Sequence, residues 1–166
     1  GIGSCAEYEI SSDPINHDGV LKSCTMYDAA KIATFQLLEQ IFNSKNISFA
    51  WCRLFYLYGE GEDKRRLVPY IRSQLSLGEI ANLSSGYQVR DFINVTAAGK
   101  IIADVALSEQ SGAVNVCSGE PKTLREHAIE IAKEYGREDL LNFGGRKDNL
   151  LEPFYVVGIP NWNDTE

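Results

Sequence analysis

Apolar positions recur along the chain at two spacings, one typical of helices and the other typical of strands. Residues 26–42 carry Ala, Ile, Leu and Phe side chains at helical spacing, and a polar run at 43–46 ends the pattern. This spacing predicts a long, largely buried helix. A nearly continuous apolar and aromatic run follows at 47–58 and is closed by Gly59. Such a run is typical of a strand covered on both faces in a parallel sheet, so helix and strand together predict half of a β-α-β unit.

The remaining chain alternates shorter helices and strands, which favours an α/β fold. A polar loop is expected at 59–66. Thr96 stands where it would cap the helix that follows it, and Thr123 and Glu126 have the spacing of a capping box. We predict further helices over 67–77 (with its start around Pro69), 96–109 and 123–135. Short strands are expected over 80–83, 87–94 and 114–117.

The chain is large enough to form its own core. Its 166 residues are 44% hydrophobic, which favours a single domain that needs neither a disulfide framework nor a structural metal. The 4 cysteines lie far apart without a C-x-x-C pair, and Cys52 and Cys117 fall within apolar runs. We interpret these two as buried free thiols in a reducing compartment. Because the sequence also has only 2 histidines, we expect no metal site.

Charge and hydropathy argue against several classes of partner. The 16 Lys and Arg against 23 Asp and Glu give a formal net charge of -7, the wrong sign for wrapping nucleic acid or adhering to anionic lipid. Any anionic ligand must therefore be held locally. No apolar run is long enough to span a membrane, and no secretory signal pattern opens the sequence. We expect a soluble, cytoplasmic protein.

Tyr27 and Lys31 are the first candidates for chemistry. They are four positions apart on the predicted helix and so lie on one face. A nearby ammonium group favours the phenolate form of a tyrosine, which suits such a tyrosine to act as acid or base. Ser4 follows the tail of a predicted buried strand, so its hydroxyl is placed to bond the same substrate oxygen. The alternative is structural, with a tyrosine that anchors an amphipathic helix beside a solvated lysine.

Five short motifs follow one another along the chain. They are Ser-x-x-x-Tyr at 4–8, Tyr-x-x-x-Lys at 27–31, Arg-x-x-x-x-Tyr-Gly at 53–59, Gln-Val-Arg-Asp-Phe at 88–92 and Asn-Val-Cys-Ser-Gly at 115–119. In this order they resemble the extended short-chain dehydrogenase/reductase family, with its NAD-dependent nucleotide-sugar epimerases, dehydratases and 4-ketoreductases. Each motif is weak alone, but the combination is specific. The resemblance extends to about Gly158.

The resemblance implies the C-terminal part of a Rossmann-type doubly wound parallel sheet plus a small α/β substrate-binding subdomain. Residues 1–60 would form the C-terminal portion of the Rossmann-like domain, with the catalytic Ser and Tyr-x-x-x-Lys. Residues 61–166 would form mainly the nucleotide-sugar-binding subdomain, and 87–117 would return in part to the Rossmann sheet. No Gly-rich G-x-x-G-x-x-G turn precedes Ser4, and the chain begins without Met. We therefore expect only the C-terminal half of a longer, truncated or processed enzyme.

The resemblance also implies roles for individual residues at a catalytic site. Tyr27 would be the acid or base on a sugar hydroxyl or keto group. Lys31 would hold the nicotinamide ribose and favour the Tyr27 phenolate, while Ser4 would orient the carbonyl. Phe55 joins Tyr27 and Lys31 as an implied contact of the cofactor, NAD or NADP, which exchanges hydride with a sugar carbon.

Three further residues are implied contacts of the substrate, a nucleotide-diphosphate sugar. The forked guanidinium of Arg90 suits a diphosphate, and Arg146 is a weaker candidate of the same kind. The alternative for Arg90 is a surface arginine paired with a neighbouring carboxylate. Tyr56 is the third implied contact, at a position where many epimerases have Asn.

Two positions limit which of the family's reactions the resemblance implies. Cys5 and Ala6 stand where the family's 4,6-dehydratases carry an Asp-Glu pair, and neither side chain transfers a proton usefully in that role. The resemblance therefore favours a 4-epimerase or 4-ketoreductase acting on a nucleotide-diphosphate hexose, inactive as this chain alone. The alternatives are a non-catalytic nucleotide-sugar-binding or oligomerisation module and an unrelated α/β domain. A bare sheet edge favours a homodimer or pairing with the missing N-terminal half.

Overall fold

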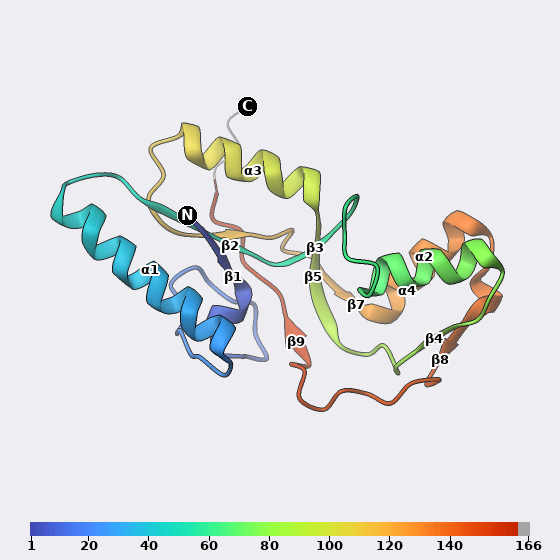
Figure 1. Cartoon of the computed structure of the whole chain (residues 1–166). Coiled ribbons are helices and arrows are strands. Elements are labelled where there is room, and N and C mark those ends of the chain that lie inside the picture. The colour runs from blue at the N-terminus through green and yellow to red at the C-terminus, as the bar shows by residue number, and fades with distance from the viewer. Residues whose placement is uncertain (163–166) are drawn as a thin grey trace.

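The computed structural model describes residues 1–162 and contains a small parallel sheet with helices on its faces (Figure 1). Strands β1 (Ile2–Ser4), β2 (Ala50–Leu54) and β6 (Gly112–Val116) lie side by side in that order and are all parallel. Parallel neighbours need crossover connections, and helices supply them here. The α/β class predicted from the sequence is confirmed.

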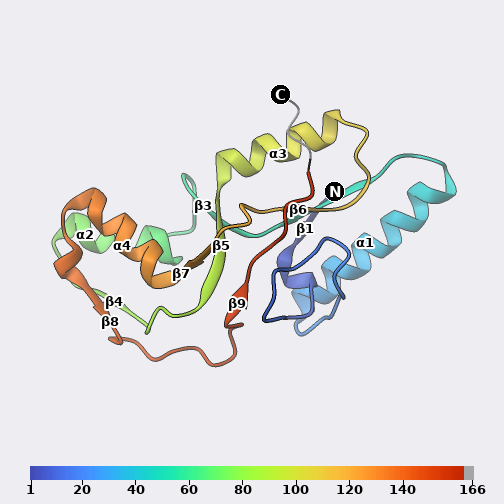
Figure 2. The same ribbon diagram turned by 180° about the vertical axis from the view of Figure 1, so that it is seen from behind.

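Helices α1 (Met26–Ser44) and α3 (Val95–Leu107) cover opposite faces of this sheet (Figure 1, and from behind in Figure 2). Trp51 of β2 points to the α1 side, where its ring centroid lies 5.7 Å from that of Phe35. Cys52, the next residue, packs in the core formed with α3. Side chains alternate between the faces of a strand, so β2 is buried from both sides.

A second sheet connects this lobe to the rest of the chain. In it, β5 is parallel to β3 and β9 and antiparallel to β7. The chain therefore passes from the first sheet to the second and back again (Figure 1). The strands are β3 (Tyr56–Tyr58), β5 (Val89–Asn94), β7 (Pro121–Thr123) and β9 (Tyr155–Val156).

The single strand predicted over 47–58 is wrong, because the structure divides this run into β2 and β3. The break falls at Phe55, whose amide donates to the Val116 carbonyl at 3.2 Å. After that bond the chain leaves β6 and pairs with β5 instead. Both halves are flanked by protein, so the apolar pattern does not mark the point where the chain changes sheets.

The second lobe is a helix pair on a two-stranded sheet. Helices α2 and α4 pack on each other through a core that includes Ile71, Leu75 and Ile131. Its strands β4 and β8 are parallel. The elements are α2 (Leu67–Leu77), β4 (Ala81–Leu83), α4 (Leu124–Tyr135), the 3-10 helix η2 (Glu138–Leu140) and β8 (Leu141–Phe143). Another 3-10 helix, η1 (Cys5–Glu7), follows β1 in the first lobe.

One of the two predicted helix caps is confirmed and the other is wrong. Thr123 Oγ1 accepts the Glu126 amide at 3.0 Å, and Glu126 Oε2 accepts the Thr123 amide at 2.8 Å, which is the predicted capping box. At α3 the cap is Asn94, whose Oδ1 accepts the amide of Thr96 at 2.9 Å. The helix therefore begins earlier than predicted.

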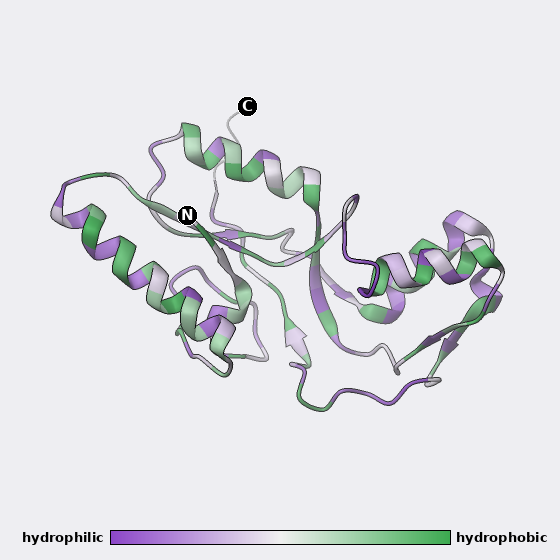
Figure 3. Cartoon of the chain, in the orientation of Figure 1, coloured by the Kyte–Doolittle hydropathy of each residue, from purple (hydrophilic) through white to green (hydrophobic). Residues whose placement is uncertain are grey.

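The prediction that α1 is largely buried is also wrong. Of its 19 residues only Asp28 and Phe35 are buried, and Leu37 is 62% exposed. Figure 3 shows hydrophobic and hydrophilic residues interspersed along the whole helix. The cause is position: α1 packs on η1 and on β1, an outer strand of the three-stranded sheet, so little protein covers its other sides within residues 1–162. No helix of these residues is both long and apolar enough to cross a membrane.

Candidate functional site

Two cavities adjoin near the carboxyl ends of β1 and β2, the edge at which parallel α/β sheets bind ligands. The first, here named the Tyr27 cavity, has a volume of about 410 Å³ and is lined by Ser4, Tyr27 and Lys31. The second, the Arg90 cavity, has a volume of about 360 Å³. Tyr56 and Arg66 line both cavities. The structure therefore brings the implied catalytic residues and the implied substrate contacts to adjoining spaces.

Ser4 is placed by the turn that ends β1. Its Oγ accepts the Ala6 amide at 3.2 Å, which caps η1. Its own amide donates to Glu7 Oε1 at 2.8 Å, completing a capping box. Both bonds fix the backbone at the mouth of the Tyr27 cavity.

Tyr27 lies in the first turn of α1, whose start is fixed by a capping box of Thr25 and Asp28. Thr25 Oγ1 bonds the Asp28 carboxylate, which also accepts the Cys24 amide at 2.8 Å and the Thr25 amide at 2.7 Å. Burial alone would raise the pKa of Asp28, but these hydrogen bonds lower it to about 2. The charged cap holds the helix start, and Tyr27 is left 56% exposed at the cavity.

Lys31 lies one turn further along α1 and reaches back to the sheet. Its Nζ donates to the Ile2 carbonyl at 3.0 Å and lies 5.9 Å from the centre of the Tyr27 ring. An ammonium group has three hydrogens, so this bond leaves donors for a ligand. The lysine is thus oriented by β1 and placed beside the phenol.

Cys5 and Ala6 line the same cavity. Burial raises the pKa of the Cys5 thiol to about 12, with the Asp91 carboxylate adding to the shift. The thiol is therefore neutral at physiological pH and a poor proton-transfer group. Of the other thiols, those of Cys52 and Cys117 are buried and free, as predicted.

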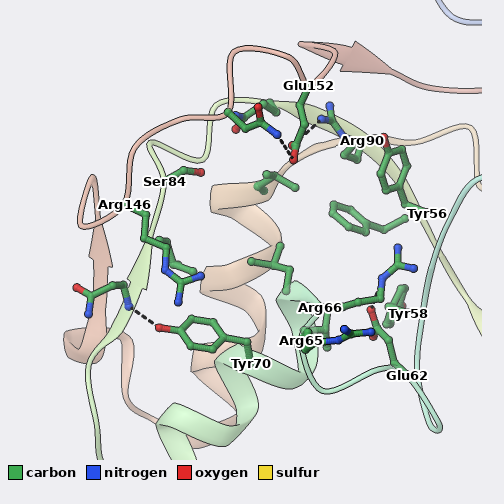
Figure 4. Close-up of a pocket in the computed structure, with 18 of the residues that line it drawn as sticks. Tyr56, Tyr58, Glu62, Arg65, Arg66, Tyr70, Ser84, Arg90, Arg146 and Glu152 are labelled. Carbon is green, nitrogen blue, oxygen red and sulfur yellow. Dashed lines mark hydrogen bonds and ion pairs between the residues drawn. The ribbon is translucent and has the colours of Figure 1, made fainter. Parts of the chain in front are cut away.

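The Arg90 cavity gathers the positive charge that an acidic chain needs for an anion (Figure 4). Its cations come from three separate segments of the chain. The carboxylates on its wall are Glu62 and Glu152. The cations are Arg65, Arg66, Arg90, Arg146 and Lys147.

Arg90 is almost fully buried, with 2% of its surface exposed. Its Nη1 donates to the Val89 carbonyl at 2.9 Å, and its Nη2 lies 3.6 Å from Glu152 Oε2. Its guanidinium also lies 5.0 Å from the centre of the Tyr56 ring. The arginine does pair with a carboxylate, as the structural alternative requires, but it does so on a cavity wall and not on an open surface.

Tyr56 connects the two cavities. Burial raises the pKa of its phenol to about 12, with the Cys5 thiol adding to the shift and the Arg90 guanidinium opposing it. The hydroxyl therefore remains a neutral hydrogen-bond donor at neutral pH. Phe55, the preceding residue, is 4% exposed and lines the Tyr27 cavity only.

Arg146 enters the Arg90 cavity from the segment after β8. Its guanidinium lies 4.5 Å from the centre of the Tyr70 ring, a cation–π contact. The Tyr70 hydroxyl accepts the Asn82 amide at 3.1 Å, which holds the ring in place (Figure 4). Arg90 and Arg146 thus face one space although they are far apart in sequence.

The cations of the loop before α2 belong to none of the sequence motifs. Arg66 lies 3.4 Å from Glu62 and borders both cavities, and Arg65 pairs with Asp63 at 2.6 Å. Burial raises the pKa of Glu62, while Arg66 opposes the shift. The adjacent arginines at 65–66 were the available signal, since a paired cation in a polar loop suits an anion.

The Tyr27 cavity fits one end of a dinucleotide cofactor. Lys31 retains donors for ribose hydroxyls, and Phe55 provides an apolar wall for a flat ring. The outer edge of β1 pairs with no strand of the described residues. The sequence has no Gly-rich turn to hold a pyrophosphate. The residues therefore fit the nicotinamide and its ribose, and not the remainder of NAD(P).

Comparison with known sequences gives a family and one curated relative. The model described as "NAD dependent epimerase/dehydratase family" matches residues 2–117. A dTDP-6-deoxy-L-talose 4-dehydrogenase (NAD(+)) from Aggregatibacter actinomycetemcomitans is 25% identical over 135 residues. That match covers 74% of this chain and 46% of the relative, so the chain spans about half the length of the curated protein that it matches.

Solved structures show the same fold. A UDP-N-acetylglucosamine 4-epimerase from Methanobrevibacter ruminantium M1, in complex with UDP-N-acetylmuramic acid, superposes with a TM-score of 0.87 at 20% identity. The match covers 96% of this chain and 53% of that one. A UDP-glucose 4-epimerase from Thermotoga maritima, with UDP-glucose, gives a TM-score of 0.84 at 14% identity, with coverage of 96% and 53%. At these identities the likeness concerns the fold alone.

Proposed function

This chain belongs to the NAD dependent epimerase/dehydratase family, and we propose that it is part of an NAD(P)-dependent nucleotide-sugar oxidoreductase. The proposed reaction is 4-epimerisation or 4-keto reduction of a nucleotide-diphosphate hexose. One observation carries the proposal: Ser4, Tyr27 and Lys31 line a cavity that adjoins the cluster of Arg90 and Arg146. A proton-transfer group and an anion-binding group are thus placed to act on one ligand.

The proposed chemistry at the Tyr27 cavity is proton transfer at a sugar oxygen. The Tyr27 hydroxyl gives or takes the proton, and Ser4 Oγ bonds the same oxygen and orients it. Lys31, whose Nζ lies 5.9 Å from the centre of the Tyr27 ring, donates to the ribose of the cofactor. NAD(P), when bound, supplies or accepts the hydride at the sugar carbon.

The proposed role of the Arg90 cavity is to bind the diphosphate. Guanidinium groups make paired hydrogen bonds to phosphate oxygens, and the burial of Arg90 reduces competition from water. Arg146, from the segment after β8, would bind the same diphosphate, and the Tyr56 hydroxyl would donate a hydrogen bond near the sugar. We expect Glu152 to release Arg90 when the diphosphate binds, since a carboxylate repels phosphate.

Dehydration is disfavoured as the proposed reaction. Removal of water needs an acid and a base beside the sugar. Cys5 has a thiol whose pKa is raised to about 12, and Ala6 has no titratable group. Within the Tyr27 cavity, Tyr27 is therefore the group best suited to exchange protons with the substrate.

We propose that the two parts of the chain bind different ligands, as the sequence suggested. Residues 1–60 would serve the cofactor side and 61–166 mainly the nucleotide sugar, with 87–117 returning in part to the sheet. The unpaired edge of β1 within the described residues supports pairing with an N-terminal half or with a second copy.

A second candidate is a module that binds a nucleotide sugar without turning it over. It is favoured by the Arg90 cavity, whose cations all come from this chain, whereas the Tyr27 cavity lies beside the unpaired β1 edge. Binding without catalysis is the outcome that this candidate predicts.

Turnover by the complete gene product separates the candidates. The protein is incubated with NAD or NADP and a panel of UDP- and dTDP-hexoses, and separately with NADH or NADPH and nucleotide-linked 4-keto sugars. Products are identified by mass spectrometry and NMR. A 4-epimer formed with no net change in the cofactor, or a 4-hydroxy product formed with one NAD(P)H oxidised per keto sugar reduced, supports the oxidoreductase. Saturable binding with no product supports the binding module. If the protein shows no binding and no turnover, both candidate functions are contradicted.

A further inference from the structure

Glu7 and Arg53 form an ion pair in the interior, outside the set of residues that the proposed reaction uses. Glu7 Oε2 accepts Arg53 Nε at 2.8 Å, and their side chains are 0% and 2% exposed. Two charges at such depth lose their hydration, and only good geometry and further hydrogen bonds compensate for that loss. The pair therefore calls for a physical reason beyond stability.

The carboxylate of Glu7 bonds directly to the backbone of Ser4. Its Oε1 accepts the Ser4 amide at 2.8 Å, and its oxygens lie 3.1 and 3.0 Å from Trp51 Nε1. With Arg53 this gives the carboxylate donors from two residues of β2 and from Ser4, the last residue of β1. Its position, and with it that of Ser4, is determined by β2.

Arg53 extends the same contacts to α1. Its guanidinium lies 4.9 Å from the centre of the Phe35 ring and 4.6 Å from that of Tyr8, and its Nη1 donates to the Tyr8 hydroxyl at 2.9 Å. Phe35 follows Lys31 by four positions and Tyr27 by eight, so all three share one face of the helix. One side chain thus touches the helix face that carries the proposed catalytic pair.

We propose that the Glu7–Arg53 pair positions Ser4 relative to Tyr27 for proton transfer. The inference rests on the proposed function of the Tyr27 cavity. An apolar pair of similar volume would fill the interior as well, often with no loss of stability. What it lacks is an acceptor for the Ser4 amide. The charged pair supplies that acceptor and ties it to α1 through Arg53.

Two double variants of the complete gene product test the acceptor. Glu7→Gln/Arg53→Met keeps a carbonyl oxygen for the Ser4 amide, whereas Glu7→Met/Arg53→Met removes it, and neither carries a buried charge. We expect the Met/Met variant to have a kcat lower by up to ~100-fold, the effect of a misplaced catalytic group. The Gln/Met variant retains most of the activity. KM for the nucleotide sugar stays the same in both, because the Arg90 cavity is not altered.

A cycle with Ser4→Ala distinguishes positioning from general damage. If the pair acts through Ser4, the Met/Met substitutions lower kcat no further once the hydroxyl is gone. If it serves only the fold, the two losses multiply. The exposed ion pair of Glu9 and Lys22, 2.8 Å apart, is the matched control, and Glu9→Met/Lys22→Met leaves kcat unchanged.

Thermal unfolding accompanies every variant. Should Met/Met fail to fold, Glu7→Asp replaces it: the shorter side chain keeps its charge beside Arg53 but withdraws from the Ser4 amide, and its loss of kcat must also vanish in Ser4→Ala. Equal kcat in the Gln/Met and Met/Met variants, or losses that multiply, overturns the inference. A wild-type protein without turnover contradicts the proposed function itself.

Discussion

Arg146 has one contact that matters for ligand binding, the face of Tyr70 at 4.5 Å. Because that contact leaves the edge of the guanidinium free to bond phosphate, Arg146→Met should raise KM for the nucleotide sugar by about 10- to 100-fold, the loss of a charge-assisted bond of ~1.5–3 kcal/mol. Steady-state kinetics of the complete gene product measures this, and kcat should change little. Arg137→Met, which breaks the exposed pair with Asp139, is the control and should leave KM unchanged. An unchanged KM in Arg146→Met contradicts the assignment.

At the scale of residues, sequence motifs located part of the candidate site. Tyr27 and Lys31 were found because their spacing on one helix face is local and readable. Arg66 and Glu7 were not assigned, because their importance depends on contacts across the fold. Glu7 becomes informative only when Arg53, far along the chain, is seen beside it.

His127 on α4 gives a prediction at the scale of packed elements. Its ring stacks on Phe92 with centroids 4.0 Å apart and meets Tyr58 edge-on at 5.1 Å. Neither ring nitrogen has a hydrogen-bond partner among the described residues. Burial lowers the pKa of His127 to about 4, and the charge of Lys122 adds to the shift, against a weaker opposing effect of Glu130. The packing of α4 on β3 and β5 thus depends on a neutral imidazole.

Stability should therefore fall as this imidazole is forced to take up a proton. The pKa of His127 is 6.5 in the unfolded chain and about 4 in the folded protein. The neutral imidazole therefore contributes fully to the free energy of unfolding above pH 6.5, and this contribution is lost as the pH falls towards 4. The loss amounts to about 3 kcal/mol in the free energy of unfolding. Urea unfolding at several pH values measures it, and His127→Leu should remove the loss in this window. His17→Leu is the control and should keep it. A wild-type protein equally stable at pH 7 and pH 4.5 contradicts the prediction.

At the scale of elements, periodicity predicted which helices and strands exist better than it predicted how deeply each is buried. Helix α2 ends at Leu77 as the sequence indicated but begins at Leu67, before the start expected around Pro69, and the Thr123 capping box is present. The division of 47–58 was missed because the apolar run continues through both strands, although β2 has a buried centre and β3 is only half-buried. The burial of α1 was overestimated because periodicity shows which side chains are apolar and not what lies against them. The point where the chain changes sheets and the burial of α1 both depend on the elements that pack against a segment, and not on the sequence of that segment.

At the scale of the whole molecule, apolar surface lies beside an unpaired strand edge. Strand β1 has one partner among the described residues, and Leu37 and Ile41 on α1 are 62% and 39% exposed. Such an edge and patch favour association. We predict that the chain of 166 residues, expressed alone, forms dimers or larger species in light scattering.

Substitutions on the helix test where the chains meet. Leu37→Lys with Ile41→Lys should shift the isolated chain towards monomer, because both residues lie on one face of α1. Leu107→Lys, at the exposed end of α3, is the matched control and should leave the distribution unchanged. A strict monomer in the unmodified chain at micromolar concentration contradicts the prediction.

The central claim is that Tyr27 is the proton-transfer group of a nucleotide-sugar oxidoreductase, and Tyr27→Phe in the complete gene product tests it most directly. The substitution removes one oxygen from a side chain that is 56% exposed, so folding should be unaffected. The account predicts a kcat lower by about 10²- to 10⁴-fold, the usual contribution of general acid–base catalysis, with KM for the nucleotide sugar unchanged. Tyr135→Phe, on α4, should retain full activity. Full activity in Tyr27→Phe would contradict the account.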